Sequence, residues 1–153
     1  MTAITAIAAT TANTAPVRID RANPDVYPAL IKVSETIGAQ GLDKKLHHLI
    51  HLRASQINGC AFCVKMHTRE AREDGETHDR LDRLIVWAHV SDFSEAEKAA
   101  LAWTEALTTL DPKTDYASLR GRLRQSFTDK EIGALTATIG MINLWNRIQV
   151  SAH

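Results

Sequence analysis

The chain has 153 residues, of which 44% are hydrophobic and only 5% aromatic, and its 18 basic and 18 acidic residues balance. This length suits one domain that buries a core without a disulfide scaffold or a metal. Charge balance argues against a nucleic-acid-binding protein, whose phosphate contacts usually require a basic surplus. No apolar run approaches the ~20 residues of a membrane span, so we expect no membrane partner.

The first residues predict an arm outside the folded domain. Residues 1–16 are rich in Ala and Thr and contain no Lys or Arg, so they lack the charged start of a signal or transit peptide. We expect residues 1–20 to form a flexible arm or a strap on a neighbouring subunit. Residues 21–153 are expected to form a single domain, and the protein is expected to be cytoplasmic.

From residue 23 onward, apolar spacing and capping signals predict successive helices. Asn58-Gly59 is expected to break one helix, and two capping boxes, at residues 94–97 and 128–131, each begin a long helix. The segment that begins at Thr77 is expected to place Leu81, Leu84, Ile85 and Ala88 on one helical face. The expected helices cover residues 24–38, 42–57, 60–75, 77–88, 94–111, 116–125 and 128–150. No alternating strand or hairpin signal occurs, so the predicted fold class is all-α.

The only two cysteines lie in the segment SQINGCAFCVKMH, residues 55–67. On a helix, Cys60 and Cys63 share one face and His67 lies between them in projection. Cα atoms three residues apart on a helix are about 5 Å from each other, within the range that a disulfide tolerates. This spacing permits a reversible bond within one turn.

The position of the pair also indicates reactivity. Cys60 is expected in the first turn of a helix, where free N–H groups and the helix dipole lower the pKa of a thiol. A thiolate attacks a peroxide or a disulfide, and a second thiol resolves the product. Cys63, Cys60 and His67 suit the roles of attacking thiol, resolving thiol and proton carrier.

Three other interpretations of the pair compete with redox catalysis. The cysteines could be small buried hydrophobic residues. With His67 and either His48 or His51 they could hold a structural zinc ion, although such ligands normally lie on loops or knuckles. Thioredoxin-like chemistry would require a strand before the motif, and none is predicted.

Several segments together resemble one known family. They are LRASQINGCAFC at residues 52–63, MHT at 66–68, AALAWTE at 99–105 and NLWNR at 143–147. They resemble the alkylhydroperoxidase D (AhpD-like) proteins of the carboxymuconolactone decarboxylase superfamily. The resemblance extends over residues 23–150, and the cysteine motif with its lead-in is its most specific part.

The resemblance implies a compact helical fold that assembles into trimers or hexamers, and a thiol-dependent peroxidase. In that scheme Cys63 attacks the hydroperoxide, Cys60 resolves it as an intramolecular disulfide, and His67 belongs to a proton relay. No metal or organic cofactor is implied. Electrons would come from an external dithiol such as a lipoyl-bearing protein, and a peroxiredoxin could be the oxidised partner.

The chain departs from the family pattern at two positions. The family usually has a glutamate twelve residues before the first cysteine, where this chain has His48. His48 can carry protons near neutral pH, but a carboxylate would favour a protonated His67 and a second imidazole would not. We therefore expect a shifted pH optimum or weaker peroxidase turnover. Phe62 occupies the place of a histidine between the cysteines.

Three other functions stay open, the first of them because of the departure at His48. One is a general thiol-disulfide oxidoreductase with weak peroxidase activity. Another is a lyase of the carboxymuconolactone decarboxylase type, in which the cysteines take no part. A third is a non-enzymatic helical oligomer with a zinc ion or a redox switch.

Residues outside the cysteine motif receive structural interpretations. The charged stretch 69–83 is interpreted as a solvated helix face with ion pairs at helical spacing. The tryptophans Trp87, Trp103 and Trp145 are expected in the core or at a subunit interface. Asn146 and Arg147 are expected to be structural.

Overall fold

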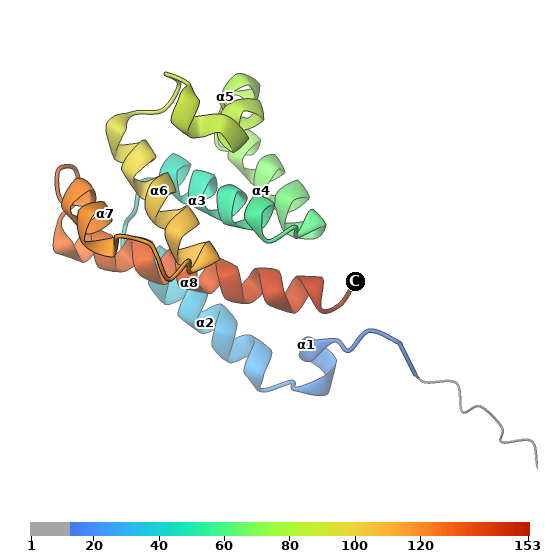
Figure 1. Cartoon of the computed structure of the whole chain (residues 1–153). Coiled ribbons are helices and arrows are strands. Elements are labelled where there is room, and N and C mark those ends of the chain that lie inside the picture. Colours follow the sequence, from blue (N-terminus) through green and yellow to red (C-terminus); the bar gives the residue numbers. More distant parts are fainter. Residues whose placement is uncertain (1–12) are drawn as a thin grey trace, which may run out of the picture.

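The computed structural model describes residues 13–153, and these form helices joined by short loops (Figure 1). No strand occurs in this part of the chain, and the predicted all-α class is confirmed. Residues 1–12, which contain most of the expected arm, lie outside the described residues. The helices are α1 (Ile19–Ala22), α2 (Val26–Gly38), α3 (Lys44–Ile57), α4 (Ala61–Glu73), α5 (His78–Arg83), the 3-10 helix η1 (Leu84–His89), α6 (Glu95–Thr109), α7 (Tyr116–Leu123) and α8 (Asp129–Val150). Within residues 13–153, no helix is long and apolar enough to cross a membrane.

Local capping signals define several helix ends. Both predicted capping boxes form, with Ser94 at the start of α6 and Thr128 at the start of α8. In each box the side-chain oxygen accepts the N–H of the residue three positions later, which removes one unsatisfied donor. At its N-terminal end α2 begins two residues later than predicted, after the separate turn α1.

The expected helix from Thr77 to Ala88 changes type at Leu84. Side chains of a 3-10 helix repeat every three residues, so Leu81, Leu84 and Trp87 share the buried face. Ile85 is instead 61% exposed and Ala88 is also exposed, so the prediction that they share one face with Leu81 and Leu84 is wrong. An α-helical period of 3.6 residues predicts one face for all four side chains, whereas the observed 3-10 winding turns Ile85 and Ala88 outward.

Helix α3 lies at the centre of the fold and packs against α4, α6 and α8. Its two buried faces join two hydrophobic clusters. Leu46 and Ile50 pack with residues of α6, α7 and α8, while Leu49 and Leu52 pack with residues of α4, α5, η1 and α6. Since α3 contributes to both clusters, the helix that precedes the cysteines is held rigidly.

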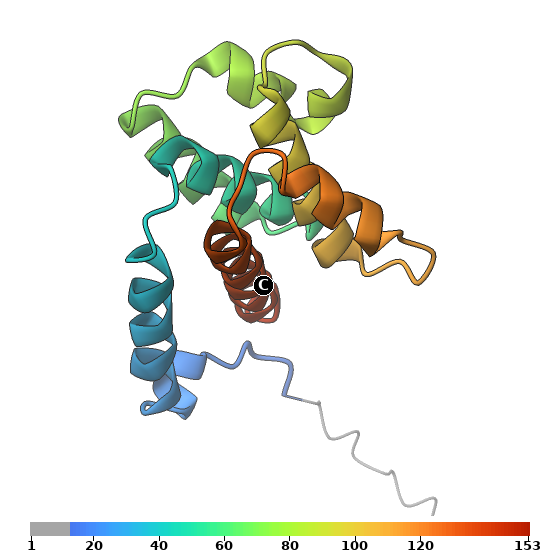
Figure 2. The same cartoon turned by 90° about the vertical axis from the view of Figure 1, so that its left-hand side faces the viewer.

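Helix α2 is attached more loosely than the other long helices. It contains no buried residue, and it lies beside α8 at the edge of the molecule (Figure 2). The Trp145 Nε1–H group donates to Ser34 Oγ at 3.0 Å, and the Tyr27 and Trp145 rings meet edge to face. Two aromatic rings and one hydrogen bond therefore hold α2 against α8.

The charged stretch 69–83 is only partly solvated. Glu76 is 6% exposed, and both of its carboxylate oxygens accept hydrogen bonds from the Arg80 guanidinium. Arg80 also pairs with Glu97 of α6 at 2.5 Å and stacks over the Phe93 ring. The expected ion pairs at helical spacing are confirmed, for example between Arg69 and Glu73, but the interpretation as a solvated face is wrong at Glu76. This carboxylate is buried and requires the Arg80 partner.

Candidate functional site

A helix-ending turn positions the first cysteine. The Cys60 N–H group donates to the Ser55 carbonyl at 3.1 Å, and the Gly59 N–H group donates to the Gln56 carbonyl at 3.2 Å. These two bonds form a Schellman motif, which requires a left-handed residue just after the helix. Gly59 provides it with φ = +64°. The predicted break at Asn58-Gly59 is confirmed, and it delivers the chain directly to Cys60.

Cys60 lies at the N-cap of α4, one residue before the expected first turn. Its Sγ atom accepts the Cys63 N–H group at 3.3 Å, the role that a serine or aspartate oxygen usually fills. Cys60 and Cys63 form a disulfide, and their Cα atoms are 5.3 Å apart, close to the expected 5 Å. The pair is therefore joined within one turn at a helix start.

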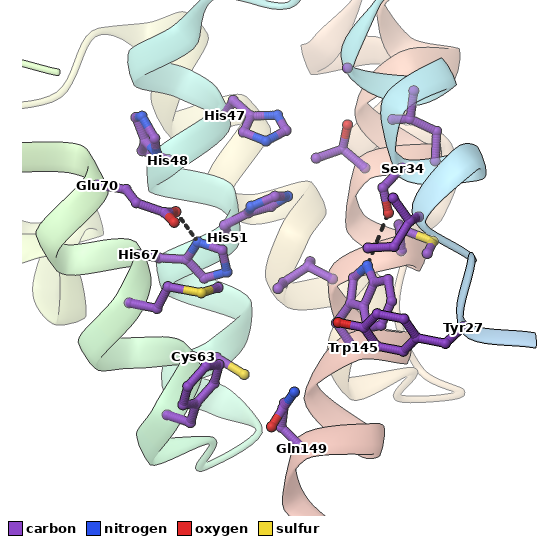
Figure 3. Close-up of a pocket in the computed structure, with 18 residues that line it drawn as sticks. Tyr27, Ser34, His47, His48, His51, Cys63, His67, Glu70, Trp145 and Gln149 are labelled. Atoms are coloured by element: carbon purple, nitrogen blue, oxygen red, sulfur yellow. Dashed lines mark hydrogen bonds and ion pairs between the residues drawn. The ribbon is translucent and has the colours of Figure 1, made fainter. Parts of the chain in front are cut away.

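The two sulfur atoms differ in their access to a cavity of about 470 Å³. Residues of α2, α3, α4 and α8 line this cavity, and Figure 3 shows Cys63 facing it. Both cysteines are buried, at 2% exposed for Cys63 and 0% for Cys60, but only Cys63 is among the residues that line the cavity. Much of the wall is apolar, with contributions from Tyr27, Phe62, Met66, Met141, Ile142 and Trp145.

His67 lies one turn after Cys63 on α4 and lines the same cavity (Figure 3). The residue is 6% exposed. Its Nδ1 atom contacts Glu70 Oε2 at 3.1 Å, and its Nε2 atom has no hydrogen-bond partner. Burial lowers the pKa of His67, and the Glu70 carboxylate opposes that effect. A neutral His67 that donates its Nδ1 hydrogen to Glu70 presents an unprotonated Nε2 to the cavity.

His48 also lines the cavity, but its ring is bound by a residue at the C-terminal end of α4. Its Nε2 atom lies 2.6 Å from Oδ2 of Asp74, the C-cap residue of α4, and Asp74 also pairs with Lys44. The Nδ1 atom of His48 is buried without a hydrogen-bond partner. The fold therefore brings the four predicted site residues to one region, although only Cys63, His67 and His48 line the cavity.

Two further histidines of α3, His47 and His51, join His48 and His67 in an imidazole cluster. The His51 ring lies 4.7 Å from the His67 ring and 4.0 Å from the His47 ring, measured between centroids. Burial lowers the pKa of His51 well below its usual value, and it also lowers the pKa of His47. Near neutral pH these rings are therefore uncharged and can pack against one another.

The structure adds residues that sequence reasoning missed. Glu70 was assigned to the solvated charged stretch, yet it pairs with His67; the spacing of three residues on one helix is the signal that could have identified it. Asp74 pairs with His48 across 26 residues, for which no local signal exists. Trp87 and Trp103 are buried as expected, whereas Trp145 lines the cavity.

A buried amide network supports the turn before Cys60. The Asn146 Nδ2 group donates to Ser55 Oγ at 3.0 Å, and its Oδ1 atom accepts from Asn58 Nδ2 at 2.9 Å. Arg147 donates to the backbone carbonyl and side-chain oxygen of Asn143. Asn146 does not line the cavity, and its contacts agree with the structural role expected for it.

Metal binding can be examined over residues 13–153. In that range, no group of three or more His, Cys, Asp or Glu side chains is arranged to hold a metal ion. The four histidines instead contact one another, Glu70 and Asp74.

Comparisons with known proteins agree on the fold. A protein of unknown function from Agrobacterium tumefaciens, with a suggested role as the antioxidant defence protein AhpD, superposes with a TM-score of 0.83. It is 38% identical, and the match covers 89% of this chain and 93% of that one. The debrominase Bmp8 superposes with a TM-score of 0.76 over 86% of this chain and 70% of its own, at only 20% identity, which shows a shared fold alone.

Two sequence relatives extend this result. The uncharacterised protein YdfG of Bacillus subtilis is 34% identical over 128 residues, which are 84% of this chain and 87% of YdfG. The alkyl hydroperoxide reductase AhpD of Mycobacteroides abscessus is 35% identical over 79 residues, 51% of this chain and 44% of that protein. The model of the carboxymuconolactone decarboxylase family matches residues 24–106, which include both cysteines and the whole histidine cluster. The chain therefore belongs to the carboxymuconolactone decarboxylase family and to its AhpD-like members.

Proposed function

We propose that the protein is a thiol-dependent peroxidase that reduces alkyl hydroperoxides through a dithiol–disulfide cycle of Cys60 and Cys63. One observation carries this proposal. Cys63 lines a largely apolar cavity that His67, with its unpartnered Nε2 atom, also lines, while Cys60 is bonded to Cys63 and does not line the cavity. An attacking thiol must meet substrate, whereas a resolving thiol must meet only its partner.

The proposed cycle has three steps. First, the Cys63 thiolate attacks the distal peroxide oxygen; the O–O bond breaks, Cys63 becomes a sulfenic acid, and the alkoxide leaves as an alcohol after taking a proton. Second, the Cys60 thiol attacks that sulfur, and the disulfide forms as water leaves. Third, an external dithiol reduces the disulfide and is itself oxidised. His67 accepts the Cys63 proton through Nε2 and returns it to the leaving oxygen.

The same scheme defines the proposed partners. The cycle uses no metal and no organic cofactor, so the reductant must reach the disulfide from outside, as a lipoyl-type dithiol could. A peroxiredoxin is the proposed alternative partner. We also propose a homo-oligomer, a trimer or hexamer, in keeping with the apolar side chains that α2 exposes, among them Val26, Ile31 and Val33.

Peroxide consumption by cysteine variants tests the proposal. With cumene hydroperoxide and dihydrolipoamide, Cys63→Ser should abolish turnover. Pre-reduced Cys60→Ser protein freed of dithiol should consume about one equivalent of peroxide and stop at a sulfenic acid, which a dimedone adduct on Cys63 would report by mass spectrometry. Normal turnover by Cys63→Ser, or labelling of Cys60 instead, would contradict the assignment.

A general thiol-disulfide oxidoreductase is a second candidate, because His48 replaces the glutamate that the family pattern implies and is bound to Asp74. Comparing rates on a hydroperoxide and on a protein disulfide separates the two activities. The lyase alternative needs neither cysteine, so lactone decarboxylation that survives the double change Cys60→Ser and Cys63→Ser would support it instead.

A further inference from the structure

We propose that Glu70 is the positioning carboxylate of this site, which orients His67 and supports its protonated form so that Cys63 is present as a thiolate. This inference uses the proposed function only in taking Cys63 as the reacting thiol. Glu70 lies on α4, ten residues after Cys60, far in sequence from the position where the family pattern has its glutamate.

The first argument is the contact itself. Glu70 Oε2 lies 3.1 Å from His67 Nδ1, and the i to i+3 spacing keeps both side chains on the same face of α4. A carboxylate that accepts from Nδ1–H selects the tautomer with a free Nε2. That Nε2 is buried and unpartnered in a cavity that Cys63 also lines. The contact therefore prepares His67 to accept a proton on the cavity side.

The second argument is that His48, in its observed position, cannot stabilise a protonated His67. Its Nε2 is engaged by Asp74, which sits eleven residues after Cys63, about 16 Å along the helix axis. His48 moreover lowers the pKa of His67 by charge repulsion, whereas Glu70 raises it. Of these two neighbours, only Glu70 stabilises a protonated His67.

The other ionisable groups around His67 do not provide a negative charge. Helix α3 presents His47, His48 and His51, and α2 presents the Tyr27 hydroxyl. Helix α8 lines the cavity with Thr138, Met141, Ile142, Trp145 and Gln149, all uncharged. Glu70 is therefore the one carboxylate among the residues that line this cavity.

The sign of the effect makes the inference testable. A carboxylate acting directly on a nearby thiol disfavours the thiolate, so removing its charge would lower the pKa of Cys63. A carboxylate acting through His67 has the opposite effect, because its loss weakens the imidazolium that stabilises the thiolate. The two mechanisms predict shifts in opposite directions for the same substitution.

The experiment measures alkylation of Cys63 by iodoacetamide against pH, in full-length reduced protein that carries Cys60→Ser. Serine is a good N-cap, so this background retains the start of α4. The variants are Glu70→Gln, Glu70→Asp, and Glu73→Gln as a matched control, since Glu73 is a carboxylate of the same helix, 66% exposed and paired with Arg69. Circular dichroism confirms folding of each variant.

We expect Glu70→Gln to raise the midpoint of the alkylation profile and to slow the reaction at pH 7 about threefold to tenfold, the effect of up to one pKa unit. Glu70→Asp should recover part of the rate, and Glu73→Gln should match the parent. In a His67→Gln background, Glu70→Gln should no longer slow the reaction, because the carboxylate acts through the imidazole.

Two results would overturn the inference: a profile of Glu70→Gln that coincides with the parent or moves to lower pH, or an equal slowing by Glu70→Gln with and without His67. No peroxide enters the measurement, so its outcome is independent of the proposed activity. If wild-type protein reduces no hydroperoxide, the proposed function fails while the alkylation result still decides the role of Glu70.

Discussion

The Nε2 atom of His48 lies 2.6 Å from the Oδ2 atom of Asp74, and this contact ties the second turn of α3 to the C-cap of α4. Lys44 holds the other oxygen of the same carboxylate. Hydrogen bonds from Lys44 and then His48 keep the pKa of Asp74 below its usual value. The residue that departs from the family pattern is thus part of the packing between the two helices that carry the site.

Replacing His48 by glutamate tests this structural coupling. His48→Glu places a second carboxylate against Asp74, so we expect a lower urea midpoint at pH 7. Adding Asp74→Asn to His48→Glu should restore much of the loss, because the like-charge contact disappears. His78→Glu, at the exposed first residue of α5, is the control and should not lower the midpoint. Additive losses in the double variant would show that the two side chains do not interact.

The turn before Cys60 provides a prediction on stability. Gly59→Ala forces a Cβ into a left-handed conformation at φ = +64°, which costs about 1–2 kcal/mol. No atom lies within 4 Å of the added Cβ, so the backbone alone causes the loss. Gly121→Ala, also in open space but inside α7, should instead stabilise by about 0.5–1 kcal/mol. Urea denaturation of both variants measures the contrast, and equal shifts would contradict it.

The buried carboxylate Glu76 provides a second stability test. Arg80→Met leaves Glu76 without its guanidinium partner, and we expect a loss of about 3–5 kcal/mol. Arg83→Met is the matched control, because Arg83 is half-exposed and its ion pairs should contribute less than about 1 kcal/mol. Combining Arg80→Met with Glu76→Gln should recover part of the loss. Similar effects of the two arginine substitutions would refute the buried-pair argument.

The imidazole cluster predicts the pH dependence of folding. In the disulfide form that the structure shows, burial lowers the pKa of His51 and His67 below 6.5 in the folded state. Above about pH 7, the folded and unfolded states of this oxidised protein therefore bind no extra proton at these two side chains. As the pH falls below 6.5, the unfolded chain takes up protons that the folded chain does not. Stability therefore decreases on acidification from pH 7 to 5, by up to about 1.4 kcal/mol per pH unit for each imidazole that stays neutral.

Urea midpoints between pH 7 and 5 measure that slope. His51→Gln should make the dependence shallower, since one imidazole with a lowered pKa is gone, whatever the effect of the substitution on stability at pH 7. The carboxylates with lowered pKa, such as Asp74, act only at more acidic pH and do not confuse this range. A stability that is constant or rises from pH 7 to 5 would contradict the uncharged state of His51 and His67.

The predictions from sequence succeed where neighbours within four residues decide the outcome. Ser94 and Thr128 begin helices because each can bond to the N–H three residues later, and Gly59 ends one because it accepts positive φ. The same short range allows Cys60 and Cys63 to be recognised as a pair. The prediction fails at η1 because α-helices and 3-10 helices both place residues i and i+3 on the same face. The two helix types differ only in where they place residue i+4 and later residues.

By itself, the sequence determined the all-α class, the start of α4 at the cysteines and the resemblance that the family match confirms. Only the tertiary structure decided that Cys63 lines a cavity and Cys60 does not, that Asp74 binds His48, and that Glu76 is buried. The cavity wall joins α4 to Tyr27, more than thirty residues before this helix, and to Trp145, more than seventy residues after it. Capping and periodicity depend on local backbone geometry, whereas access and burial depend on which distant helices pack together, and that packing has no local signature.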